Sequence, residues 1–175
     1  AYGIDTMAHR ATVDAGGKTI VVIGAGLLQP YLAQNKSLFK QIIATGGAIV
    51  SGFPLLEEAS AWTFPKRNRI IAGLSQGCVV VQAAKKSGAL ITAKYALQEG
   101  RQVFAVPGQF DDDLSMGCHG LLKDGAKLVQ NTQDILEEFG IEQSEQEAED
   151  VQLSIQPEHP ILIHCAQPIG LMDLS

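Results

Sequence analysis

Short apolar runs alternate with helical stretches along most of the chain. Each run is continuous rather than broken by a polar residue at every second position, which is typical of strands buried on both faces of a parallel sheet. We predict five strands on this basis, over residues 19–26, 48–54, 78–84, 102–108 and 126–130. Strands of this kind need helices on both faces to cover them.

Between the predicted strands, apolar residues recur at helical spacing. The residues expected on buried faces are Leu38, Ile42 and Ile43 in one helix, and Leu90, Ala93 and Leu97 in another over residues 89–99. Both helices stop at glycine, which suits the left-handed backbone at a helix end. A third helix is predicted within residues 132–140. The helix that opens the chain carries Asp5 and His9, and we expect a structural role for this His.

Strands and helices that alternate through short links predict an α/β fold with a doubly wound, mostly parallel sheet of the extended Rossmann-like kind. We assign residues 1–140 to this core and expect it to be truncated at the amino terminus, because the chain begins as if just after a strand. Residues 141–158 are acidic and lack aromatics, as linkers do. Residues 159–175 are apolar again and are expected to begin a second, truncated domain.

The net charge of -6 hides a division of charge along the chain. Residues 1–127 carry 13 Lys and Arg against 9 Asp and Glu, a balance of +4, whereas residues 128–175 carry 10 acidic residues and no Lys or Arg. A basic body with an acidic tail remains compatible with a nucleic-acid partner. No apolar run approaches the ~20 residues of a membrane helix and no signal pattern opens the chain, so we expect a cytoplasmic protein without a membrane partner.

The stretch FPKRNRIIAGLS, residues 64–75, is predicted to be a helix with a basic amino-terminal end. Pro65 suits the first turn, where its missing N–H costs nothing, and Phe64 is expected just outside the helix. The residues predicted to be buried are Ile70, Ile71 and Leu74. Lys66, Arg67 and Arg69 then crowd a helix end that already carries about half a positive charge.

Cations at that end need an anion, so the stretch indicates a phosphate site, with Phe64 available to stack on a base. The alternative is a solvated helix end whose arginines pair with Glu57 and Glu58.

A second stretch of the same type is KKSGALITAK, residues 85–94. Ser87 and Gly88 lie between a predicted strand and a helix, at the carboxyl end of the sheet where open α/β folds bind ligands. Lys85, Lys86 and Lys94 flank them. Two anion sites of one type favour a phosphate-rich ligand, and the alternative is an ordinary turn with a serine cap.

No metal or cofactor site is predicted. Three widely spaced cysteines are expected to be reduced and mostly buried: Cys78, Cys118 and Cys165. His159 and His164 offer too few ligands for zinc. Residues 106–120 are rich in turn residues and are expected to form a loop, and the aspartates at residues 111–113 are interpreted as a solvated part of it. The GxG at residues 24–26 lacks the later glycine of a dinucleotide fingerprint. No nucleophile with a base and an orienting group is apparent, so we do not expect an enzyme.

Five motifs, taken in order, resemble the bacterial DprA/Smf family, the DNA-processing protein A of natural transformation. They are GIDTMAHRAT, GGKTIVVIGAGL, FPKRNRIIAGLS, SGALITAKYALQEGRQVFAVPG and SMGCHGLLKDGAKLV, and they extend from Gly3 to about Phe139. The resemblance implies a Rossmann-like domain that binds and protects incoming single-stranded DNA, forms a homodimer and loads the RecA recombinase, and that is not known as an enzyme.

Carried over residue by residue, the resemblance implies three surfaces. DNA is expected near Lys66, Arg67, Asn68 and Arg69, and near Ser87 and Gly88. Phe64 and Lys36 join the expected DNA site from their own positions rather than from the resemblance. A dimer contact is expected at His119, Leu122 and Leu128, and a RecA-facing surface at Leu97, Gln98 and Arg101.

Two departures from the family's pattern affect the expected DNA site. The family's GSR strand end, whose Arg touches DNA, would lie upstream of Ala1. The basic residue that usually follows YP in the family is replaced here, since residues 31–35 read YLAQN. Lys36 is the candidate substitute. Residues 159–175 resemble the beginning of the winged-helix-like domain that many members carry.

Two other functions are compatible with parts of this pattern. The same sheet and twin anion sites suit a nucleotide-binding enzyme related to the lysine-decarboxylase-like phosphoribohydrolases. Those enzymes share a PGGxGTxxE motif, whereas this chain reads VPGQ at residues 106–109 and has no matching Glu. The other possibility is a fragment that keeps only dimerisation or partner contacts.

Overall fold

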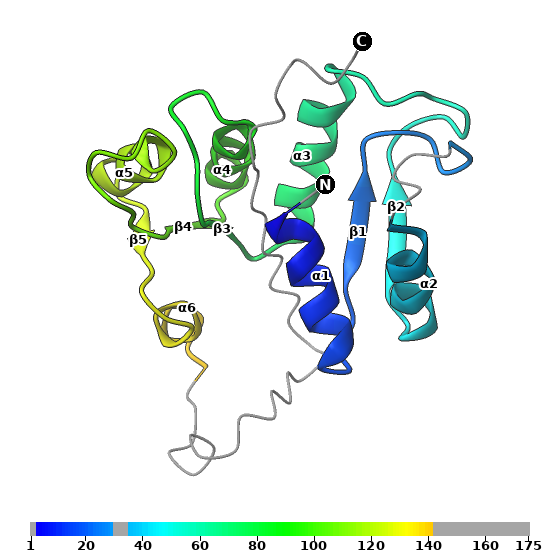
Figure 1. Cartoon of the computed structure of the whole chain (residues 1–175), viewed down its shortest axis with the longest axis horizontal. Helices are drawn as coiled ribbons and strands as arrows, with labels where there is room; N and C mark the ends of the chain where they lie inside the picture. The colour runs from blue at the N-terminus through cyan, green and yellow to red at the C-terminus, as the bar shows by residue number, and fades with distance from the viewer. Residues whose placement is uncertain (1–2, 30–34, 142–175) are drawn as a thin grey trace.

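The computed structural model describes residues 3–29 and 35–141 (Figure 1). Within these residues the elements are α1 (Ile4–Asp14), β1 (Ile20–Ile23), α2 (Lys36–Ala44), β2 (Ala48–Ser51), α3 (Thr63–Leu74), β3 (Gly77–Val80), α4 (Gly88–Gln98), β4 (Gln102–Ala105), α5 (Met116–Lys123), β5 (Lys127–Leu128) and α6 (Gln133–Glu138). The predicted linker from residue 142 on, the second domain at 159–175 and the YLAQ segment at 31–34 lie outside the described residues.

Every strand pairing in the described chain is parallel, as predicted. β1 pairs with β2, and β4 lies between β3 and β5 in a second sheet. The strands therefore form two sheets rather than one continuous sheet. Helix α3 contacts both β1 and α4, so it joins the two sheets (Figure 1). The predicted α/β class, with parallel strands and intervening helices, is confirmed.

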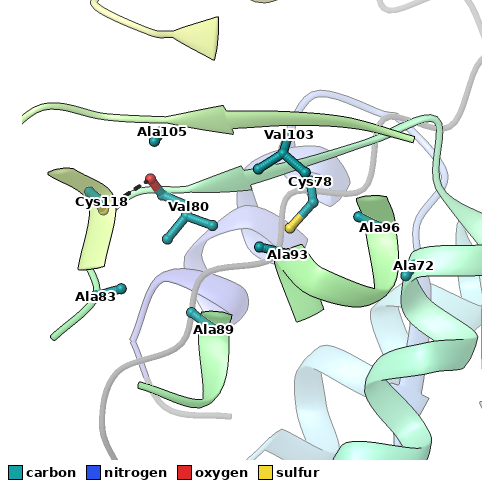
Figure 2. Close-up of a cluster of buried hydrophobic side chains, with 10 residues drawn as sticks. All are labelled: Ala72, Cys78, Val80, Ala83, Ala89, Ala93, Ala96, Val103, Ala105 and Cys118. Carbon is teal, nitrogen blue, oxygen red and sulfur yellow. Dashed lines mark hydrogen bonds between the residues drawn. The ribbon is translucent and has the colours of Figure 1, made fainter. Parts of the chain in front are cut away.

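The second sheet has an apolar core on each face, which is the doubly wound arrangement that the apolar runs predict. On one face, side chains of β3 and β4 pack against α4 and α5 (Figure 2). The residues are Cys78, Val80, Val103, Ala105, Ala89, Ala93, Ala96 and Cys118. On the other face Val79 and Phe104 pack against the α6 region through Ile135 and Phe139. Alternate residues of each strand thus serve opposite cores.

Two of the cysteines lie in this core. Cys78 and Cys118 are buried free thiols, and burial raises the pKa of the Cys78 thiol to about 12. Cys118 donates to the carbonyl oxygen of Val80 over 3.6 Å (Figure 2). The prediction of reduced, buried thiols is confirmed for these two, and Cys165 lies outside the described residues.

Three leucine and isoleucine side chains predicted to be buried are exposed instead: Ile43 (58%), Leu74 (44%) and Leu97 (58%). In each case the helix buries a face that does not include the predicted side chain, and in α4 the buried residues recur at i, i+3 and i+4. In α4 that pattern is Ala89, Thr92, Ala93 and Ala96. Small residues on this face let α4 approach α3 closely, which leaves the longer Leu97 on the outside.

The α5 helix corrects the expectation of a loop throughout residues 106–120. The loop ends at Ser115, where Asp112 accepts hydrogen bonds from the Leu114 N–H (3.0 Å) and the Ser115 hydroxyl (2.8 Å). One glycine of this helix has a packing role: a Cβ added to Gly117 would lie 2.6 Å from the carbonyl oxygen of Ala83. Only glycine allows α5 to lie this close to the end of β3.

Candidate nucleic-acid interface

Helix α3 begins at Thr63, two residues before the predicted start at Pro65, so Phe64 lies inside its first turn. The buried Thr63 hydroxyl donates to the Ser60 carbonyl (2.8 Å) and accepts from the Ser60 N–H (3.1 Å). The first turn carries no acidic residue. The positive end of the helix dipole and the cations that follow it are therefore not neutralised within that turn.

Arg67 ties this helix to the first sheet. Its Nη1 donates to the carbonyl oxygen of Val22 in β1 (2.8 Å), and its Nε donates to Oδ1 of Asn68 (3.0 Å). Its guanidinium carbon lies 5.8 Å from the centre of the Phe64 ring. Asn68 itself is only 6% exposed. The direct DNA contact predicted for Asn68 stays a prediction, and in this structure the residue holds Arg67 in place.

Phe64 is also engaged within the fold. A Cβ added to Gly24, at the end of β1, would lie 3.2 Å from its ring. The ring is half-buried between this backbone and the Arg67 side chain. The stacking role predicted for Phe64 is untested, and its packing gives it a structural role as well.

Trp62 is the exposed aromatic at this site, and the sequence analysis missed it. Its ring is 50% exposed, meets Phe53 edge to face at 5.8 Å between ring centres, and has the Lys66 ammonium 4.4 Å from its own centre. The cation–π contact holds Lys66 at the surface beside an aromatic ring. The available signal was that Trp62 is the only tryptophan and lies two residues before the FPKRNR motif.

Arg69 extends the basic surface toward α4. Its side chain is 70% exposed, and its Nε lies 3.5 Å from the Glu99 carboxylate at the end of α4. The alternative drawn from the sequence paired these arginines with Glu57 and Glu58, whereas the partner of Arg69 is Glu99. An exposed pair of this kind contributes about 0–1 kcal/mol, so it leaves Arg69 available to a phosphate.

Two loops at the carboxyl ends of β1 and β2 are joined beside α3. The Gly26 N–H donates to the Glu57 carbonyl (2.8 Å) and the Leu28 N–H to the Leu55 carbonyl (2.9 Å). An added Cβ on Gly26 would lie 2.1 Å from the Pro54 carbonyl oxygen, so the two backbones are in direct contact. This junction leads into the segment that places Trp62 and the start of α3.

The second predicted anion site lies at the start of α4. Ser87 is 5% exposed and its hydroxyl accepts from the Ala89 N–H (3.3 Å). This hydrogen bond is the serine cap that was the alternative interpretation, and the anion site at Ser87 and Gly88 stays a prediction. Gly88, the first helical residue, is exposed. Lys36, the first residue of α2, is also exposed.

The residues predicted for protein contacts differ in exposure. Leu97 and Leu128 are exposed, at 58% and 43% respectively, and Gln98 is also exposed. Leu122 packs partly against the core of the second sheet. His119 is half-buried, with Nε2 lying 3.1 Å from the Gly108 carbonyl. Arg101 donates to the Gly73 carbonyl (3.2 Å), which ties the end of α4 to α3.

The structural role predicted for His9 is supported by its surroundings. Its Nδ1 lies 2.7 Å from the Thr19 hydroxyl, and burial lowers the pKa of this His, an effect that Asp5 partly opposes. Across residues 3–29 and 35–141, no three His, Cys, Asp or Glu side chains come together as metal ligands would. None of the helices in the described chain has the length and apolar character needed to cross a membrane.

Comparison with known proteins identifies relatives over this same region. The family model described as DNA recombination-mediator protein A matches residues 1–140. The DNA processing protein DprA of Streptococcus pneumoniae is 50% identical over 139 residues, which cover 79% of this chain and 49% of that protein. Protein Smf of Escherichia coli is 46% identical over 143 residues, 81% of this chain and 38% of that protein. The chain thus spans half or less of the length of these relatives.

Two solved structures resemble the fold. The crystal structure of DprA from Streptococcus pneumoniae has a TM-score of 0.70 at 49% identity, covering 78% of this chain and 48% of that one. A structure of DNA processing protein A from Helicobacter pylori, described for its single-stranded DNA binding mode, has a TM-score of 0.62 at 21% identity, covering 77% and 71%. At that lower identity the second likeness supports the fold alone.

Proposed function

This chain belongs to the DNA recombination-mediator protein A family, and on that premise we propose that it binds single-stranded DNA as a recombination mediator in DNA uptake. The observation that carries the proposal is the exposed basic surface of α3, where Lys66 lies over Trp62 and Arg69 extends toward α4. The names of the relatives, which describe DNA processing, support it.

The mechanism follows from what each group offers a strand. Lys66 and Arg69 contact phosphates by charge, while Arg67, held by β1 and Asn68, adds positive potential at a fixed position. The exposed start of α4 offers the backbone N–H of Gly88 to a further phosphate. Trp62 offers an aromatic surface to a base. Phosphate contact and stacking carry little base information, so binding is expected to be independent of sequence.

Fluorescence anisotropy with a labelled oligothymidine tests this function. We expect saturable binding that weakens steeply with salt, because log K for a single strand falls with a slope of about -0.7 per phosphate neutralised. A duplex of the same length is expected to bind more weakly, since its bases cannot reach Trp62. Absence of binding at low salt, or release of free base from a nucleoside monophosphate, would contradict the proposal, and the second result would favour the phosphoribohydrolase alternative.

A homodimer is part of the proposal, with His119, Leu122 and Leu128 at the contact. The exposed Leu128 on the edge strand β5 is the most accessible of the three. Leu128→Glu is expected to lower the molar mass measured by light scattering to that of one chain, because a buried carboxylate without a partner is costly. Leu114→Glu, at a residue with nearly equal exposure (42%), is the matched control. A wild-type chain that is monomeric at all concentrations would contradict the dimer.

We also place the RecA contact at Leu97, Gln98 and Arg101, with RecA loading as its outcome. Because Arg101 is bonded to α3, Leu97 and Gln98 are the more available side chains. Binding of purified RecA to the immobilised chain, measured by surface plasmon resonance, tests this placement, and equal binding by a Leu97→Ala variant would oppose it. The mediator is proposed to act in the cytoplasm and without catalysis of its own.

A further inference from the structure

A cleft of about 610 Å³ runs along the outward face of α4. Ser87, Leu90, Ile91, Lys94, Tyr95 and Gln98 line it at helical spacing, and Lys85 and Lys86 close its amino-terminal end. From Ser87 to Gln98 the helix rises about 16 Å, at 1.5 Å per residue. The cleft is therefore longer than a single phosphate group requires.

The lining of the cleft is basic. Three of its side chains are lysines, none is acidic, and within residues 3–29 and 35–141 none of these lysines forms an ion pair. Three ammonium groups that converge on one cleft repel one another unless an anion lies between them. Tyr95 and the apolar Leu90 and Ile91 add a surface suited to flat, weakly polar groups. A ligand with repeated negative charges and aromatic faces fits both features.

The carboxyl-terminal end of the cleft lies near the basic surface of α3. It ends at Gln98, and the next residue, Glu99, is the partner of Arg69 at 3.5 Å. Because Arg69 pairs with Glu99, the negative charge of Glu99 at this end of the cleft is partly neutralised. A polyanion bound at Lys66 and Arg69 can thus pass directly into the cleft, where Lys94 lies one helical turn from Gln98.

We propose that the α4 cleft is a second binding track for single-stranded DNA, which holds the part of the strand that leaves the α3 surface. Its phosphates lie against Lys85, Lys86 and Lys94, and a base lies against Tyr95. This inference rests on the proposed function. The proposed function places DNA at the start of α4, at Ser87 and Gly88. The cleft extends this contact along the length of the helix. It also places the strand beside Leu97 and Gln98.

The test replaces Lys85, Lys86 and Lys94 together by Gln in the full chain. With a labelled 30-nucleotide oligothymidine, we expect affinity at low salt to fall at least 10-fold. The slope of log K against log salt concentration is expected to become shallower by about 2, because each of three lost phosphate contacts accounts for about 0.7. The matched control replaces Lys18, Lys40 and Lys123, three exposed lysines that line no part of the cleft, by Gln. It removes the same charge and is expected to change affinity less than 3-fold.

Photocrosslinking gives a second measurement that does not depend on total charge. An oligonucleotide with 5-iodouracil is expected to crosslink to the peptide that contains Tyr95, and the cleft variant is expected to lose this crosslink. If wild type binds DNA but the cleft variant and the control bind equally well, the cleft proposal is overturned and the proposed function stands. If wild type binds no DNA, both are overturned. If the cleft variant loses affinity for polyglutamate but keeps its affinity for DNA, the DNA track is overturned, and the cleft is instead a contact for an acidic protein segment.

Discussion

Replacing Lys66 and Arg69 together by Ala is expected to weaken oligothymidine binding about 100-fold at low salt. Each charge-assisted contact to a phosphate contributes about 1.5 kcal/mol, and two such losses correspond to two orders of magnitude in Kd. Both side chains are exposed and neither holds the fold together, since the exposed pair of Arg69 with Glu99 contributes little. The salt slope is expected to fall by about 1.4.

Anisotropy at two salt concentrations measures this effect, and thermal unfolding checks that the variant is folded. The control is Lys18→Ala with Lys123→Ala, which removes two exposed lysines from other parts of the surface. Affinity within 3-fold of wild type is expected for the control. Equal binding by wild type and the Lys66 and Arg69 variant would show that α3 is not the DNA site, whatever the other residues do.

Gly26→Ala is expected to lower the free energy of unfolding by about 3 kcal/mol or more, a large effect for one methyl group. The new Cβ would lie 2.1 Å from the Pro54 carbonyl oxygen and 2.3 Å from that of Leu55, and both obstacles are backbone rather than a movable side chain. Relief requires the two loops to separate. Separation breaks the hydrogen bond between the Gly26 N–H and the Glu57 carbonyl.

Urea denaturation measures this loss, and Gly73→Ala is the matched control. Gly73 lies within α3, and an added Cβ there meets nothing within 4 Å. Alanine in a helix interior is favoured over glycine by about 0.5–1 kcal/mol, so the control is expected to be slightly more stable than wild type. A Gly26→Ala variant as stable as wild type would show that the loop junction is not tightly packed.

Prediction from the sequence was most successful where a local rule decides the structure. The apolar runs place all five strands, and the serine cap at Ser87, which was the alternative to an anion site, follows from its position before a helix. Faces of helices were predicted less well. Leu97 and Ile43 are exposed because each helix packs against the rest of the fold through another of its faces. The apolar character of a side chain does not by itself say which face of a helix will be buried.

The α/β class, the basic helix α3 and the family could all be predicted from the amino-acid sequence, because they depend on local spacing, charge order and motif identity. Only the tertiary structure decided how the basic residues divide their tasks. Arg67 turns inward because the Val22 carbonyl and the Asn68 amide lie within hydrogen-bonding reach, whereas Lys66 and Arg69 stay at the surface with Trp62 and Glu99. These partners lie one to 45 residues away in the chain, and folding alone brings the distant ones together.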